Sequence, residues 1–176
     1  MTADERKSKI ESYGRASDQL AEALSEFPRQ MWQYKPGPDR WSIHEILLHI
    51  ADSEANSYIR CRCFLAEPGK SIMAYDENQW AASLRYHEQS ATEAVELFGL
   101  LRKMSFRLIK TLPESAWSGT IFHPESGSMT LDDWLTIYTN HIPEHIRQIQ
   151  ATYDAWVAEQ EGQRPDPGKS LFRSLT

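Results

Sequence analysis

The stretch Thr139-Asn140-His141-Ile142-Pro143-Glu144-His145-Ile146 carries two histidines four residues apart within a segment of helical apolar spacing. In an α-helix this separation places both imidazoles on one face, one turn apart. Large apolar side chains recur around them at steps of three and four, which marks this face as the buried one. They are Trp134, Tyr138, Ile142, Ile149 and Trp156. Two histidines on an inward face need either hydrogen-bond partners in the core or a bound metal ion.

Pro143 lies between the two histidines and predicts an irregularity in their helix. Inside a helix a proline cannot bond to the carbonyl four residues back, here that of Thr139, and its ring pushes that carbonyl aside. We expect either a kink or a helix restarted with Pro143 in its first turn and Asn140 as its cap. Both alternatives keep His141 and His145 near each other.

Three further helices are predicted upstream of this segment. The first covers residues 2–27, where apolar side chains repeat every three or four positions. The second follows Ser42 and Glu45, which form a capping-box signature, and ends near residue 67. The third spans residues 90–112 and begins with the same signature.

Four long amphipathic helices predict an all-α fold, a four-helix bundle, in a single domain of residues 1–162 followed by a tail of residues 163–176. The connection of residues 68–89 includes a short extra helix expected at residues 76–84. Its length would let the second and third long helices run parallel, since a short loop would force them antiparallel. The connector of residues 114–129 indicates an ordered loop, or a small hairpin.

Composition and charge limit the function classes. The chain has 176 residues, 40% of them hydrophobic and 25% charged, as in globular domains. A net charge of −6 argues against a general binder of nucleic acid or acidic membranes, whose affinity comes from clustered Lys and Arg. The opening residues are polar and no run approaches the length of a membrane span, so we expect a cytoplasmic protein. Cys61 and Cys63 lie about 200° apart on a helix and are expected to be inert thiols without a disulfide.

A metal site is the more specific interpretation of the histidine pair. Bundle cores build such sites from side chains that point inward on facing helices. His141 and His145 would supply two nitrogen ligands and His49, in the second helix, a third. Three imidazoles suit Zn²⁺, tolerate Ni²⁺ and Fe²⁺, and leave an open position for water or substrate. The plain alternatives are a hydrogen-bonded core pair, a boundary pair facing solvent, and a structural role for His49.

At these residues the chain resembles the DinB-like superfamily. The likeness covers most of the chain and rests on three stretches. They are Trp41-Ser42 leading into His49-Ile50-Ala51-Asp52-Ser53-Glu54, the loop His123-Pro124-Glu125-Ser126-Gly127, and His141-Ile142-Pro143-Glu144-His145-Ile146-Arg147-Gln148-Ile149. The resemblance implies an up-down-down-up bundle, a homodimer, and a divalent metal on three histidines, which map to His49, His141 and His145. Members with assigned functions include transferases that use bacillithiol or mycothiol, a maleylpyruvate isomerase, and candidate metal-dependent hydrolases.

Carboxylates near the metal should orient the ligand imidazoles. Asp52 and Glu45 lie one turn to either side of His49 and are candidates, as is Glu144. For each the alternative is an ordinary solvated helix charge. His123 could line the pocket or form a turn beside Pro124.

The sequence leaves three hypotheses about the function of the protein. The first is a metal-dependent enzyme, a thiol-dependent S-transferase or a hydrolase, acting on small electrophilic molecules with a low-molecular-weight thiol as possible co-substrate. An open-position metal would activate a bound water or hold a thiol as its thiolate. The second is a non-catalytic metal-binding stress-response protein. The third is a helical bundle that acts through protein contacts and has a structural histidine cluster.

Overall fold

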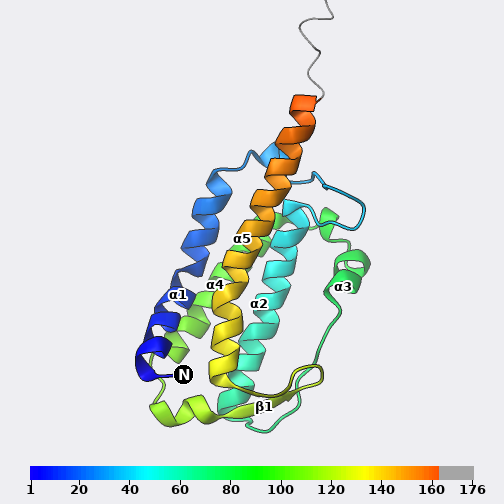
Figure 1. Cartoon of the computed structure of the whole chain (residues 1–176). Coiled ribbons are helices and arrows are strands. Elements are labelled where there is room, and N and C mark those ends of the chain that lie inside the picture. The colour runs from blue at the N-terminus through cyan, green and yellow to red at the C-terminus, as the bar shows by residue number, and fades with distance from the viewer. Residues whose placement is uncertain (163–176) are drawn as a thin grey trace, which may run out of the picture.

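The computed structural model describes residues 1–162 and shows the predicted four-helix bundle. The long helices are α1 (Ala3–Ser25), α2 (Ile43–Ala66), α4 (Ala91–Ile109) and α5 (Leu131–Gly162). In Figure 1, α1 and α5 run upward while α2 and α4 run downward, which is the expected up-down-down-up order. The predicted tail of residues 163–176 lies outside the described residues.

The long second connection allows the parallel pair. From the lower end of α2 the chain returns along the outside of the bundle, through the short helix α3 (Glu77–Ser83) and the 3-10 turn η2 (Tyr86–Glu88), before α4 begins (Figure 1). Helix α2 packs chiefly on α4 and α5, and α1 packs on the same two helices. His49 on α2 therefore faces the helix that carries the other two histidines.

The helix starts follow local sequence signals. Ser42 accepts a hydrogen bond from the backbone N–H of Glu45 at 3.2 Å, while the Glu45 carboxylate accepts from the Ser42 N–H at 2.9 Å. This reciprocal capping box satisfies two of the amides that every helix N-terminus leaves unpaired. Thr2 and Glu5 form the same arrangement at the start of α1.

The connector before α5 forms a small antiparallel hairpin, one of the two alternatives expected for it. Strands β1 (Thr120–His123) and β2 (Gly127–Thr130) pair below the bundle, after the 3-10 turn η3 (Glu114–Ser118). A further 3-10 turn, η1 (Arg29–Met31), follows α1.

Helix α5 continues through Pro143 without interruption. The alternative of a helix restarted after an Asn140 cap is therefore wrong. Packing of the buried side chains on both sides of the proline, among them Tyr138, Ile142 and Ile149, outweighs the loss of one backbone hydrogen bond.

A buried ionic network lies in the core one turn beyond His49. Arg102 on α4 donates from Nη2 to Glu54 Oε2 at 2.6 Å and from Nε to Glu54 Oε1 at 3.0 Å. The Tyr13 hydroxyl donates to Glu54 at 2.9 Å, and Arg102 Nη1 donates to the carbonyl of Tyr138 at 3.1 Å. This network ties all four long helices together and accounts for the buried Glu54 within α2.

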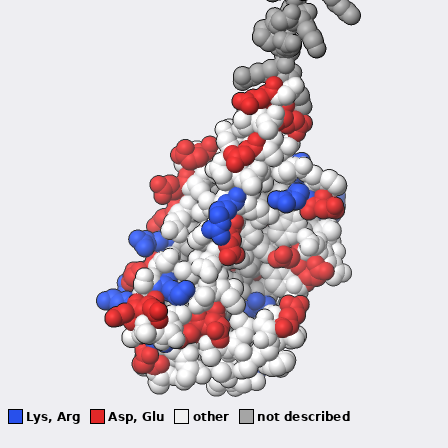
Figure 2. Space-filling model, in the orientation of Figure 1, with Lys and Arg blue, Asp and Glu red and all other residues white. Residues whose placement is uncertain are grey.

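Two further expectations concern the cysteines and the surface. Cys61 is buried, Cys63 is half-buried, and both are free thiols. Basic side chains are scattered among acidic ones on the face in Figure 2, where they form no continuous basic surface. Within residues 1–162, no helix combines the length and the apolar character that crossing a membrane requires.

Candidate metal centre

Three imidazoles from two helices converge inside the bundle. His49 projects from α2, and His141 and His145 project one turn apart from α5. One nitrogen from each ring lies within 4.8 Å of the others, and the Nε2 atoms of His141 and His145 are 3.1 Å apart. The His49 ring centroid lies 5.5 Å from that of His141 and 4.9 Å from that of His145.

The hydrogen bond to Gln148 fixes the tautomer of His145. Nδ1 of His145 lies 2.9 Å from Gln148 Oε1, one turn along α5. An amide oxygen only accepts, so this nitrogen carries the proton and donates it. The Nε2 atom is then left with a lone pair aimed at His141. An outer hydrogen bond of this kind is how proteins orient an imidazole ligand.

The donor set fits a divalent ion. Two nitrogens bound at 2.0–2.1 Å to a tetrahedral ion lie about 3.3 Å apart, close to the separation of the His141 and His145 nitrogens. His49 is 2% exposed, and its buried Nδ1 has no hydrogen-bond partner within residues 1–162. Buried polar atoms are rarely left unpaired. Its Nε2 faces Glu77 Oε2 at 3.6 Å, and Ser53 Oγ lies 3.4 Å from His141 Nε2.

Burial keeps all three imidazoles neutral. Desolvation, reinforced by the charge that His145 would carry, lowers the pKa of His49 to about 3. The same two causes, in the same order, lower the pKa of His141 well below its ordinary value. Burial also lowers the pKa of His145. Neutral imidazole is the form that binds metal, so at pH 7 protons do not compete with an ion for this site.

These lowered pKa values predict that the metal-free protein loses stability as the pH falls. The unfolded chain takes up a proton at each histidine near pH 6.5, whereas the folded chain takes up each proton only at a lower pH, so protonation favours unfolding. For His49 alone, the loss between pH 7 and pH 5 should be roughly 2 kcal/mol. Denaturant unfolding of chelator-treated protein at the two pH values measures it. The His49→Leu variant should show a smaller difference, and an equal difference would contradict this assignment.

A polar pocket opens beside His145, one of the three histidines. It has a volume of about 340 Å³ and is lined by Asp39, Arg40, Trp41, Glu77, Asn78, His145 and Gln148. The loop before α2 and the short helix α3 thus form two of its walls. The Trp41 ring centroid lies 4.9 Å from that of His49 and covers one side of that imidazole. A small molecule in this pocket would reach His145 from the solvent side.

The comparison with known families agrees with these observations. A model of the DinB superfamily matches residues 12–149 of the chain. The chain belongs to the DinB superfamily. Its likeness to that family, expected from the histidine-bearing stretches, is therefore confirmed.

Relatives of this DinB superfamily member include a candidate metal-dependent hydrolase of Oceanobacillus iheyensis, 31% identical over 62% of the chain. Another is the candidate metal-dependent hydrolase YfiT of Bacillus subtilis, 29% identical over 62% of the chain. The chain spans 63% and 62% of the lengths of these two relatives. A solved YfiT structure, described as an unusual four-helix bundle, superposes with a TM-score of 0.80 at 22% identity over 92% of the chain and 90% of YfiT. This likeness establishes the fold.

The four residues considered as supports or pocket walls make other hydrogen bonds, or none to the imidazoles, within residues 1–162 of this superfamily member. Glu45 caps α2 and pairs with Lys35 at 2.9 Å. Asp52 accepts a hydrogen bond from the Tyr86 hydroxyl at 2.5 Å. Within residues 1–162 neither carboxylate bonds to the three imidazoles, and Glu144 acts on His145 only through its charge.

His123 forms the hairpin turn. Its Nδ1 accepts the backbone N–H groups of Glu125 at 3.2 Å and of Ser126 at 3.3 Å. These contacts favour the turn-forming interpretation, in which the ring replaces a backbone acceptor at the tip of the hairpin.

Gln148 and Glu77 make the contacts to the imidazoles that were considered for Glu45, Asp52 and Glu144. The three-residue step from His145 to Gln148 could have identified Gln148, because residues at that spacing meet on a helix. Glu77 gave no such signal. It reaches His49 because the return connection lays α3 against α2.

Proposed function

We propose that the chain is a metal-dependent enzyme that holds a divalent ion on His49, His141 and His145 and acts on small electrophilic molecules. The reaction is hydrolysis or the transfer of a low-molecular-weight thiol of the bacillithiol or mycothiol type. Zn²⁺, Ni²⁺ and Fe²⁺ all suit three imidazoles. Two relatives are named as candidate metal-dependent hydrolases, which supports hydrolysis as the reaction.

The observation that carries the proposal is the convergence of three imidazole nitrogens within 4.8 Å beside a pocket. A structural metal site closes its coordination with four protein ligands, whereas three leave a position for water or substrate. When bound, the ion would supply Lewis-acid activation of a water or a thiol.

Residues around the three histidines would orient a ligand, exclude water and accept a proton. Gln148 holds the His145 ring with Nε2 turned inward. Trp41 packs against His49 and excludes water from that side. Glu77 lines the pocket with Oε2 3.6 Å from His49 Nε2 and would accept the proton of an incoming water or thiol. Burial, followed by the charge of Asp76, raises the pKa of Glu77 toward the range useful for such a base.

Turnover measurements test the proposal. Metal-loaded and chelator-treated protein are incubated with p-nitrophenyl acetate alone, and with 1-chloro-2,4-dinitrobenzene plus L-cysteine. We expect turnover in at least one of these two assays, and only with the metal-loaded protein. The Glu77→Gln variant should keep its metal and lose about 100-fold in kcat, together with the acid limb of the pH–rate profile.

A matched control is Glu96→Gln on α4, an exposed carboxylate away from the pocket, which should leave kcat unchanged. Bound metal without turnover in either assay would favour the non-catalytic metal-binding alternative. Equal turnover with and without metal would contradict the proposed enzyme.

A further inference from the structure

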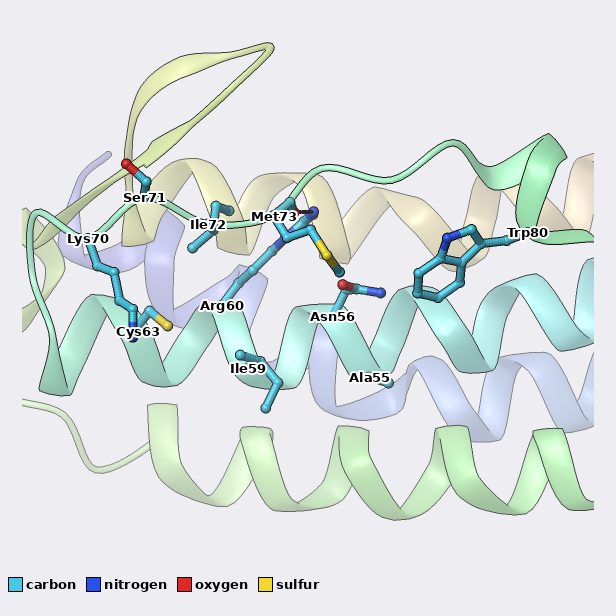
Figure 3. A pocket seen from close by; sticks show the side chains of 10 residues that line it. All are labelled: Ala55, Asn56, Ile59, Arg60, Cys63, Lys70, Ser71, Ile72, Met73 and Trp80. Carbon is cyan, nitrogen blue, oxygen red and sulfur yellow. Dashed lines mark hydrogen bonds between the residues drawn. The ribbon is translucent and has the colours of Figure 1, made fainter. Parts of the chain in front are cut away.

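A second hollow runs along the outer side of α2. It has a volume of about 430 Å³ and lies between α2 and the chain segment that leaves it, residues 68–76, with Trp80 of α3 at one end (Figure 3). Most of its wall is apolar, from Ile59 on α2 and from Ile72 and Met73 on the overlying segment. We call this hollow the α2 groove.

Backbone hydrogen bonds to the hairpin hold the overlying segment in place. The N–H of Ile72 donates to the carbonyl of Phe122 at 2.9 Å, and the N–H of Phe122 donates to the carbonyl of Lys70 at 3.0 Å. Gly69 donates to Thr120 at 2.7 Å. The groove is therefore preformed, which lowers the entropy that a ligand must lose to bind there.

Two cationic side chains line this apolar groove. Among the described residues 1–162, Arg60 donates only to neutral groups, the Tyr138 hydroxyl at 3.1 Å and the carbonyl of Met73 at 2.8 Å. Its Nε is buried without a partner, and within residues 1–162 no carboxylate pairs with Arg60. Lys70 reaches from the overlying segment toward Cys63 on α2 and pairs at the rim with the exposed Glu67. A partly buried guanidinium without a counter-charge favours an anion.

The groove is aligned with the histidine cluster. At 100° per residue, His49, Ser53 and Arg60 fall within about 40° of one another on α2, and His49 and Arg60 are separated by about 16 Å along its axis. Helix α3 borders both hollows, with Trp80 lining the groove and Glu77 lining the metal-site pocket. An elongated molecule lying along this stripe would have one end at Arg60 and the other directed toward the histidines.

We propose that the α2 groove binds an apolar small molecule that carries a carboxylate. The carboxylate pairs with Arg60, Lys70 adds positive charge at the rim, and the apolar body packs against Ile59, Met73 and Trp80. As a substrate subsite this rests on the proposed function. The binding itself requires only the groove. The substrate class is then an electrophile, or its thiol adduct, that bears an acidic group remote from the reacting atom.

Calorimetry with 4-phenylbutyrate tests the binding, and 4-phenylbutanamide, which has the same shape and no charge, serves as its control. The full chain is stripped of metal with a chelator, so that the carboxylate has no ion to bind. We expect the acid to bind about tenfold more tightly than the amide, a difference typical of one charge-assisted contact. Lys70→Gln should reduce the affinity for the acid severalfold and leave that for the amide unchanged.

Lys110→Gln is a matched control variant. Lys110 is 55% exposed and pairs with Glu11, as Lys70 is 53% exposed and pairs with Glu67, but it lies away from the groove. It should bind the acid as the parent does. Equal affinity for acid and amide, no binding of either, or an equal loss in both lysine variants would overturn the proposal. A separate Zn²⁺ titration distinguishes the two ideas, because loss of metal binding alone would leave the groove proposal standing.

Discussion

His145→Ala is expected to bind Zn²⁺ at least about 100-fold more weakly than the parent protein. The substitution removes one of three nitrogen donors and also the ring that Gln148 orients. Loss of an outer hydrogen bond to a ligand alone weakens metal binding 10- to 100-fold, so loss of the ligand itself should exceed that range. A competition titration with a chromophoric chelator at pH 7 measures the change.

Two further variants serve as comparisons for this titration. Gln148→Ala leaves all three imidazoles in place and should weaken binding by about tenfold, less than His145→Ala. His87→Ala removes an exposed histidine that pairs with Glu88 outside the cluster and should change nothing. Similar affinities for the parent and His145→Ala would remove the basis for a metal site here.

Arg102→Met is expected to lower the free energy of unfolding by about 3–5 kcal/mol, the largest stability change of any substitution considered. The side chains of Arg102 and Glu54 are 0% and 1% exposed, so the change leaves a carboxylate buried without its cation. It also removes the bond to the Tyr138 carbonyl and the contact of the guanidinium with the Tyr13 ring, 4.0 Å from its centroid. Denaturant unfolding at pH 7 measures the loss.

The double variant Glu54→Leu with Arg102→Met separates charge from packing. Replacing both members of a buried pair by apolar side chains is often nearly neutral, so the double variant should recover most of the lost stability. If it is no more stable than Arg102→Met, the network acts through packing and its hydrogen bonds to Tyr13 and Tyr138 rather than through the buried charge pair.

The helix starts and the histidine pair could be predicted because their determinants are local. Ser42 with Glu45 contains its own partner three residues away, and His141 with His145 needs only the helical repeat. The helix restart considered at Pro143 is wrong for a tertiary reason. A lone proline in a helix predicts either a kink or a restarted helix, and burial of the neighbouring apolar residues keeps α5 continuous.

The contributions of distant elements could not be predicted from spacing. Glu77 meets His49 only because the return connection places α3 beside α2. Glu45 lies one turn from His49 in sequence, yet its carboxylate is engaged by Ser42 and Lys35 at the helix start. Arg60 gave no signal either, because its neutral partners come from α5 and from the segment after α2.

Diffraction from metal-loaded crystals, measured on both sides of the absorption edge of the bound element, tests directly whether the three histidines hold a metal ion. We predict one anomalous peak between α2 and α5, at 2.0–2.1 Å from one nitrogen of each of His49, His141 and His145, with a non-protein ligand in the remaining position. A peak elsewhere, or three imidazoles hydrogen-bonded to one another with no peak between them, would contradict it.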